Sequence, residues 1–166
     1  MISFHHDILP LKDKLFRLAL RITLNPAEAE DVVQETMIKI WNRRNSWDTI
    51  DNIETFCLTI CRNLSLDKTR LMGNHALSLD TETEPPDYSH HSNPEEQVMQ
   101  RDRIQLVRQL IDQLPEKQRS CMQLRDIEGK SYKDIATILN ITEEQVKVNI
   151  FRARQTIREQ FKKADT

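Results

Sequence analysis

The side chains best suited to chemistry with a partner lie near the C-terminal end of the chain. Lys147, Arg152, Arg154 and Arg158 cluster there with Phe151, in one stretch of helical periodicity. Cationic side chains at this density neutralise the phosphates of DNA, and globular domains seldom place a phenylalanine on a basic flank. The alternative is a solvated helix face without a specific partner. We favour DNA binding because of the elements that position these residues.

Two short helices separated by a tight turn are predicted in this stretch. Ser131 is a suitable N-cap for the first helix, with Asp134 at the capping-box position. Asn140 suits the left-handed conformation that the turn requires, and Thr142 forms a second capping box with Gln145. A helix-turn-helix of this kind lays its second helix in the major groove of DNA.

The second of these helices has one apolar face, which must be buried. At about 100° per residue, this face consists of Val146, Ile150, Ala153 and Ile157. The outward face, with Val148, Asn149 and Arg152, then remains available to a partner.

The composition favours an all-α protein. The chain of 166 residues suits one large domain or two small ones, and its two glycines are too few for the turns on which hairpins depend. The net charge of −2 is unevenly distributed, because residues 1–70 balance to zero, residues 71–96 carry −6 and residues 97–166 carry +4. The basic end is therefore the end with the helix-turn-helix.

Patterns typical of enzymes and metal sites are absent from the sequence. It has no glycine-rich phosphate loop, metal cluster or nucleophile–base signature, so we expect no cofactor, no metal and no small-molecule substrate. Cys57 and Cys61 share a face of one predicted helix, where burial as small hydrophobes is favoured over a metal or redox pair. His5 and His6 lie in a segment expected to be mobile. Without a signal peptide, the protein is expected to be soluble and cytoplasmic.

Three further stretches of helical periodicity occupy the first seventy residues and can bury one small core. The first stretch ends near Asn25 and Pro26. The three apolar stripes are Leu11, Leu15, Leu18, Ala19 and Ile22, then Ala29, Val32, Val33, Met37, Ile40 and Trp41, and then Ile53, Phe56, Cys57, Ile60, Cys61 and Leu64. This assignment predicts that Trp41 is a core residue.

The periodicity is lost between residues 71 and 94, which contain no Lys or Arg and a Pro-Pro pair. This composition predicts a flexible acidic linker. Periodicity resumes near Val98, Leu114-Pro115 breaks the chain, and the next helix ends near Glu128, with Gly129 as its C-cap. We therefore predict two small helical domains, residues 8–70 and residues 95–163, joined by the linker at 71–94.

Three stretches in fixed order resemble the extracytoplasmic-function (ECF) group of bacterial sigma factors: AEDVVQETMIKIWNRR, ETFCLTICRNLSLDKTR and LIDQLPEKQRSCMQLRDIEGKSYKDIA. The resemblance covers nearly the whole chain apart from the linker and the extreme termini. It implies a promoter-melting domain followed by a four-helix domain. Such a protein binds core RNA polymerase, directs it to specific promoters and assists promoter opening, without catalysis of its own.

For the first domain, the resemblance implies docking on the clamp helices of the polymerase's largest subunit. The helix that carries Asp31, Gln34 and Glu35 corresponds to the docking surface. A mixed acidic and apolar helix face suits a protein partner better than DNA. Solvation of the helix is the alternative role for these side chains.

The resemblance also implies two sets of residues that contact the minus-ten promoter element. The turn at residues 45–52 corresponds to a loop that captures a flipped base, with Trp47 and Asp48 as candidates. Packing of Trp47 beneath the loop is an equal alternative, since the family more often has phenylalanine or tyrosine there. The third helix matches the family pattern N-x-x-x-D-x-x-R and contacts the non-template strand, the candidates being Arg62, Asn63, Asp67, Lys68 and Arg70.

For the second domain, the positions that contact the minus-thirty-five element are Lys147, Val148, Asn149, Phe151 and Arg152. Most members of the family carry serine and arginine where Val148 and Asn149 stand. Arginine prefers guanine edges, whereas asparagine can pair bidentately with adenine and valine can contact a thymine methyl group. This difference predicts an A/T-leaning upstream element. The helix at residues 114–125 corresponds to the part that meets the polymerase flap.

The implied partners are core RNA polymerase, through its clamp helices and flap, promoter DNA, and an anti-sigma factor, which usually holds small sigma factors of this group inactive. A stand-alone helix-turn-helix regulator that binds DNA as a dimer is the alternative function. The N-terminal docking and melting motifs favour the sigma factor. The sequence leaves open whether the two domains pack on each other, an arrangement expected to hide basic surfaces.

Overall fold

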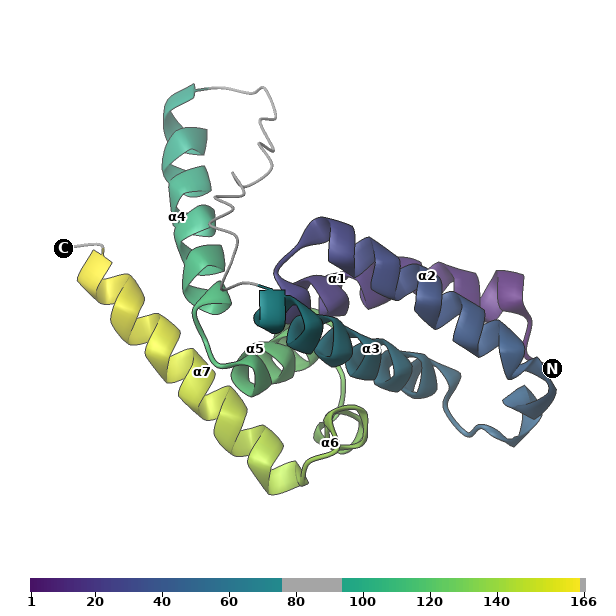
Figure 1. Ribbon diagram of the computed structural model, residues 1–166. Helices are drawn as coiled ribbons and strands as arrows, with labels where there is room; N and C mark the ends of the chain where they lie inside the picture. Colours follow the sequence, from purple (N-terminus) through teal and green to yellow (C-terminus); the bar gives the residue numbers. More distant parts are fainter. Residues whose placement is uncertain (76–93, 165–166) are drawn as a thin grey trace.

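The chain is built from helices throughout the part that a computed structural model describes, residues 1–75 and 94–164 (Figure 1). No strand occurs within these ranges, which confirms the predicted all-α class. The N-terminal unit contains α1 (Lys12–Thr23), α2 (Pro26–Asn42) and α3 (Ile53–His75), with short helical turns at Phe4–Ile8, Leu9–Leu11 and Arg44–Thr49. The C-terminal unit contains α4 (Pro94–Asp112), α5 (Glu116–Met122), α6 (Tyr132–Leu139) and α7 (Glu143–Ala164), with a turn at Gln123–Ile127.

The N-terminal helices pack against one another in pairs around the predicted apolar stripes. Leu15 and Leu18 of α1 and Val32 of α2 are fully buried in this core. The tight bend between α1 and α2 is set locally, because Leu24 adopts a left-handed conformation and the Asn25 side chain accepts a hydrogen bond from the first turn of α2.

The predicted helix-turn-helix is present in α6 and α7. Ser131 caps α6, Asn140 has the expected left-handed conformation with φ 54°, and Gly129 also has positive φ. The second capping box closes in both directions: the Thr142 hydroxyl accepts from the Gln145 backbone N–H at 3.1 Å, and the Gln145 side chain accepts from the Thr142 N–H at 2.9 Å. The two N-caps and the left-handed turn residue were therefore predicted correctly from the sequence.

Two local features of the structure add detail to the sequence interpretation. Helix α3 continues to His75, past the expected start of the linker at residue 71, because a formed helix extends by one hydrogen bond per residue and no proline stands there to stop it. The rest of the predicted linker, residues 76–93, lies outside the described residues. His5 and His6 belong to a helical turn capped by Ser3, although both side chains are exposed.

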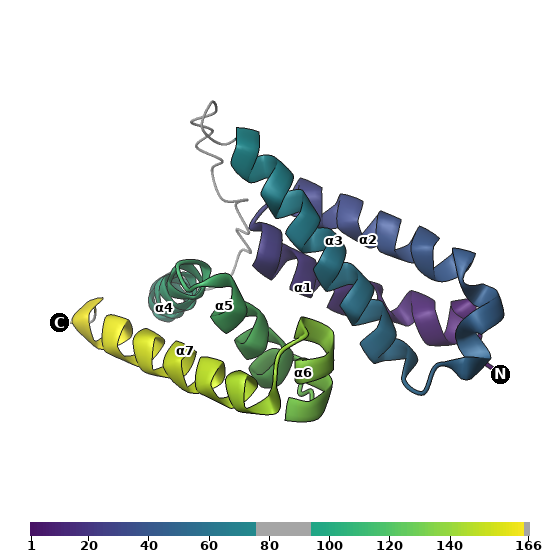
Figure 2. The same cartoon turned by 60° about the horizontal axis from the view of Figure 1, so that its bottom comes forward.

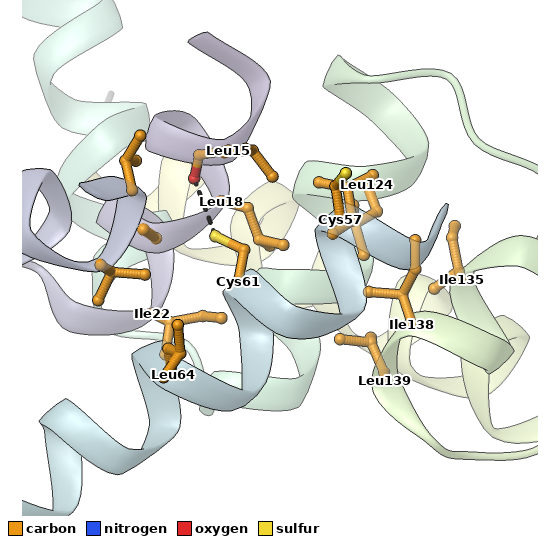
Figure 3. Packing of buried hydrophobic residues seen from close by; sticks show 14 of the residues in the cluster. Leu15, Leu18, Ile22, Cys57, Cys61, Leu64, Leu124, Ile135, Ile138 and Leu139 are labelled. Carbon is orange, nitrogen blue, oxygen red and sulfur yellow. Dashed lines mark hydrogen bonds between the residues drawn. The ribbon is translucent and has the colours of Figure 1, made fainter. Parts of the chain in front are cut away.

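The two helical units pack directly on each other, with α5 and α6 lying between α7 and the N-terminal helices (Figures 1 and 2). Helix α3 contacts α6, and α1 contacts α5. One continuous cluster of buried side chains runs through both units. Figure 3 shows Cys57 of α3 beside Leu124, with Ile138 of α6 next to them. The sequence left open whether the two domains pack on each other, and in the structure they do, in a closed arrangement.

Ion pairs cross the junction between the two units at its edge. Arg17 of α1 forms a bidentate pair with Glu128, at 2.5 and 3.1 Å. Glu54 at the start of α3 accepts from both Lys14 and Lys130, each at 2.7 Å. A third cross-unit pair joins Arg21 to Asp112 at 3.0 Å. These pairs fix the relative orientation of the units that the apolar cluster holds together.

Candidate nucleic-acid interface

The outer face of α7 is available to a partner in the closed arrangement. Val148 is 43% exposed and Phe151 is 67% exposed, and Lys147 and Arg152 are exposed beside them. Asn149 is partly exposed on the same face. Burial of Val146, Ile150 and Ala153 on the opposite face orients this surface outward, as the helical period predicts.

The side chain of Asn149 is turned back onto its own helix. Its amide Nδ2 donates to the backbone carbonyl of Gln145 at 2.7 Å. One N–H of this amide is thereby engaged, and its second N–H and Oδ1 make no hydrogen bond within the described residues, so the bidentate pairing with adenine that the residue type suggests is still possible.

A basic, aromatic-lined groove of about 570 Å³ adjoins the outer face of α7. Its lining residues are Tyr132, Lys147, Ile150, Phe151, Arg154, Gln155 and Arg158. The Tyr132 ring lies under two cations, with Arg125 at 4.4 Å and Lys147 at 5.6 Å from its centroid. Arg154 pairs with Asp126, and this hydrogen bond raises the pKa of Arg154.

The sequence interpretation missed Tyr132 as a member of this surface. Tyr132 is the first residue of α6, directly after the Ser131 cap. Its position could have been suspected, since a first-turn residue beside a cap often faces out of the core. Only the packing of α6 against α7 places it under Lys147.

On α3, the predicted minus-ten residues separate into different faces. Asn63, Asp67 and Arg70 are exposed and share one face, with Arg70 and Asp67 at 3.8 Å. Arg62 lies beside this face and donates to the Asn63 side chain at 3.4 Å. Lys68 points to α2 instead.

Lys68 therefore does not join the outer face of α3. Its ammonium lies 3.8 Å from Glu28 and 3.7 Å from Glu35, two carboxylates of α2. The physical reason is the helical period, which turns Lys68 about 140° from Asn63. In this arrangement the expected phosphate contact of Lys68 is replaced by an intramolecular one.

The loop predicted to capture a base buries its aromatic side chain. Trp47 is only 6% exposed, and its indole N–H donates to the carbonyl of Ile40 at 3.0 Å. This geometry fits the alternative of packing beneath the loop. Asp48 is exposed in the same turn, as are Ser46 and Thr49.

Trp41 was predicted to be a core residue, and this prediction was wrong, because Trp41 is 46% exposed. Its ring meets Phe4 edge-on at 5.5 Å, and the Arg44 guanidinium lies 4.9 Å from its centroid. Ile40 takes the core position of this turn, and the next residue on a helix is rotated by about 100° to the edge of the buried face.

The predicted docking residues of α2 form one outward stripe. Asp31, Gln34 and Glu35 are all exposed, and Ile38 continues the stripe one turn later at 59% exposure. Sequence reasoning did not single out Ile38. The sequence did contain an indication that Ile38 is exposed, since this apolar residue falls outside the apolar stripe of α2.

The segment predicted to meet the polymerase flap, residues 114–125, is largely covered in the closed arrangement. Leu114 and the run from Arg119 to Leu124 are buried. By contrast, the outer faces of α3 and α7 stay exposed. The expectation that closure hides basic surfaces therefore holds for a paired cation such as Lys130, whose side chain is 13% exposed, and not for the candidate DNA-contacting faces.

Burial also determines the chemistry of the cysteines. Cys57, Cys61 and Cys121 are all fully buried, as predicted for the first two, and desolvation raises the pKa of each to about 12. They are therefore thiols at neutral pH rather than reactive thiolates. Within the described ranges, no group of three or more metal-ligating side chains is found, and no helix has the length and apolar character to cross a membrane.

Comparisons with known proteins follow the same two-unit division. Residues 8–71 match the family described as Sigma-70 region 2, and residues 104–157 match Sigma-70, region 4. The chain is 32% identical over 160 residues to RNA polymerase sigma-H factor of Pseudomonas aeruginosa, covering 91% of this chain and 83% of that protein. It is 29% identical over 162 residues to ECF RNA polymerase sigma factor SigW of Bacillus subtilis, covering 91% and 84%.

Two solved structures share the fold. The sigma factor RpoE in complex with the anti-sigma factor NepR, from Bartonella quintana, superposes with a TM-score of 0.74 at 24% identity over 98% of both chains. CnrH in complex with the cytosolic domain of CnrY gives a TM-score of 0.67 at 19% identity, covering 96% of this chain and 86% of that one.

Proposed function

This chain belongs to the ECF group of RNA polymerase sigma factors, and from that premise we propose a specific division of labour among its surfaces. As an alternative sigma factor it binds core RNA polymerase and directs it to promoters in transcription initiation. The observation that carries this function is the presence of both sigma regions, in order, on one chain. A stand-alone regulator has no use for the first region.

The outer face of α7 is proposed to contact the minus-thirty-five element. Its support is the exposure of Lys147, Val148, Phe151 and Arg152 on a helix whose opposite face is buried and whose first turn is doubly capped. The neighbouring groove supplies cations for the phosphates.

The outer face of α3 is proposed to contact the minus-ten element through Asn63, Asp67 and Arg70, and Asp48, exposed in the turn that precedes α3, is proposed as a further contact. These side chains combine hydrogen-bonding groups with limited positive charge, which suits contacts to unstacked bases of a single strand. Trp47 supports this loop from below rather than entering the DNA.

The stripe of α2 is proposed as the polymerase docking surface. The exposed polar residues Asp31, Gln34 and Glu35 are followed on the same stripe by the exposed apolar side chain of Ile38, a combination typical of protein–protein interfaces. The assignment predicts that this stripe contributes to affinity for core polymerase and not to promoter sequence preference. RNA synthesis itself is the reaction of the polymerase, and we propose that this chain has none of its own.

Reconstituted transcription tests the proposed function. Purified chain is added to sigma-free core polymerase with a pool of promoter fragments, and initiated transcripts are sequenced. Specific transcripts that require the chain support the sigma function, whereas DNA binding without them contradicts it.

The substitution Arg152→Ala tests the division of labour. We expect it to weaken recognition of the upstream element by about 1–3 kcal/mol, the usual value for one arginine contact to a base, and to leave core polymerase binding unchanged. Arg103→Ala, which removes the same charge from an exposed position on α4, is the matched control. Loss of polymerase binding by Arg152→Ala alone would show that α7 has a different role.

An anti-sigma factor is proposed as a further partner. Both solved structures compared above are complexes of this kind: RpoE with the anti-sigma factor NepR, and CnrH with the cytosolic domain of CnrY. A candidate inhibitor encoded near this chain should suppress the reconstituted transcription when it is added before core polymerase. Suppression that is unchanged when the chain is replaced by another sigma factor would count against a dedicated partner.

A further inference from the structure

The cations predicted to contact DNA from α3 each have a partner within the protein. Arg70 lies 3.8 Å from Asp67 on the same face, and Arg62 donates to the side chain of Asn63 at 3.4 Å. The ammonium of Lys68 lies between two carboxylates of α2. Phosphate contacts supply much of the affinity of a protein for DNA, whereas base contacts supply specificity. The outer face of α3 therefore needs a cation from outside the predicted set.

An exposed arginine without an acidic partner lies at the N-terminal end of this face. Arg43 is the C-cap of α2, and its guanidinium carbon lies 5.9 Å from the centroid of the Phe56 ring on α3. In the part of the chain that the structure describes, its side chain makes no hydrogen bond or ion pair. Phe56 precedes Asn63 by seven residues, which places the two side chains within about 20° of each other around the helix. The contact therefore puts Arg43 on the face of Asn63, about 10 Å further along α3.

The ring contact of Arg43 leaves its hydrogen-bond donors available. A guanidinium carries five N–H donors in one plane, an arrangement that suits two parallel hydrogen bonds to a phosphate. A cation–π contact uses the charge and none of these donors. The neighbouring Arg44 differs, because it lies over Trp41 of α2 at 4.9 Å and donates Nη1 to the Trp41 carbonyl at 3.2 Å. Arg44 is therefore held on the end of α2, whereas Arg43 extends the face of α3.

We propose that Arg43 binds a phosphate of the DNA strand whose bases contact the outer face of α3. This inference rests on the proposed function of α3 and adds a residue to which the sequence pattern assigned no role. Arg43 directly precedes the turn that carries Asp48, so the phosphate it binds lies between that turn and Asn63. The alternative is a structural role, in which Arg43 only offsets the partial negative charge at the C-terminal end of α2.

The experiment uses the holoenzyme formed by the full chain with core polymerase. The DNA is a promoter fragment obtained from the reconstituted transcription, unpaired across the minus-ten element, and affinity is measured at several salt concentrations. Arg43→Ala should weaken binding by about 2- to 10-fold and lower the slope of log affinity against log salt by about 0.7, the value for one phosphate of a single strand. Arg43→Lys keeps the charge and should keep the slope. Arg44→Ala removes the same charge one residue later and, as the matched control, should leave the slope unchanged.

Uncharged phosphate analogues then locate the contact. A methylphosphonate replaces one phosphate at a time, in each strand, across the minus-ten element. We expect a position at which the replacement weakens binding of the unmodified chain by about 2- to 10-fold and has no further effect on Arg43→Ala. The same replacement should still weaken binding of Arg44→Ala. Methylphosphonates at flanking positions outside the element serve as the control.

Two kinds of failure are distinguishable, because Asn63→Ala on the same fragment tests the proposed face of α3 independently of Arg43. If Asn63→Ala weakens binding while Arg43→Ala keeps the full salt slope, the phosphate contact is overturned and the proposed function of α3 stands. Equal losses of slope in Arg43→Ala and Arg44→Ala also overturn the specific contact. If neither Asn63→Ala nor Arg43→Ala changes binding, the proposed function of this face and the phosphate contact are overturned together.

Discussion

At the scale of single residues, hydrogen bonding and burial change what several side chains are able to do. Trp47 resembles a base-stacking residue in the sequence, yet its indole N–H is satisfied by the carbonyl of Ile40. Lys68 resembles a phosphate ligand, yet it lies between two carboxylates of α2. Asn149 has engaged one of its two amide N–H groups with the Gln145 carbonyl and keeps the other N–H and its acceptor. The residue type defines which contacts a side chain is able to make, and the neighbouring groups in the fold determine which of them it makes.

Substitution of Trp47 tests its structural role. Trp47→Ala should lower the free energy of unfolding by about 3–5 kcal/mol, because it empties a buried aromatic site, whereas Trp47→Phe should cost about 1 kcal/mol for the lost hydrogen bond. Urea unfolding measures both. Promoter opening that fails with a stably folded Trp47→Phe variant would show instead that the indole contacts DNA.

At the scale of elements, each surface owes its direction to a cap and a buried stripe. The first turn of α7 is held by the reciprocal hydrogen bonds of Thr142 and Gln145, and Val146 and Ile150 anchor the helix to the core. In α2, the helical period likewise places Ile38 on the exposed face and Ile40 on the buried face.

The capping box of α7 gives a prediction at this scale. Thr142→Ala should destabilise the protein by about 1 kcal/mol and speed hydrogen exchange in the first turn of α7, because one backbone N–H loses its partner. The control is Thr137→Ala in α6, where the hydroxyl is bonded back to the Lys133 carbonyl at 3.2 Å and caps nothing. An equal loss in both variants would argue against the cap as the cause.

At the scale of the whole molecule, the two sigma regions form one body. Their apolar cluster is continuous, and Glu54 and Glu128 each accept a cation from the other unit. Within the segment at residues 114–125, Leu114 and Met122 are buried against α7 inside the C-terminal unit, whereas Cys121 and Leu124 belong to the cluster that spans both units.

Charge reversal across the junction should shift the closed arrangement. Arg17→Glu places a carboxylate against Glu128 and should raise the radius of gyration and the distance between labels on α2 and α7. The double variant Arg17→Glu/Glu128→Arg should restore closure in part, while Lys39→Glu, an exposed site on α2 away from the junction, should have no effect. Scattering profiles that are identical for all three variants would contradict the role of this pair.

Closure should also depend on pH through Glu54. Burial alone would raise the pKa of Glu54, but the hydrogen bonds from Lys130 and Lys14 outweigh burial, so its pKa is lowered from 4.5. Its contribution to closure is therefore present above about pH 4.5 and is lost as the pH falls through the lowered value. Label distances measured from pH 7 to pH 3 should show a smaller pH-dependent change in Glu54→Gln than in the unmodified chain, and equal curves would exclude Glu54 as a contributor.

The sequence by itself determined the elements and the family. Caps at Ser131 and Thr142, the left-handed turn at Asn140 and the apolar stripes are local features, encoded within a few residues of where they act, and they were predicted correctly. The tertiary structure alone decided the closure of the two units, the exposure of Trp41 and the pairing of Lys68 with α2. Helical periodicity sets the direction in which Lys68 and Trp41 leave their helices, but the side chains that they meet there come from distant parts of the chain, and periodicity does not say which helix faces pack together.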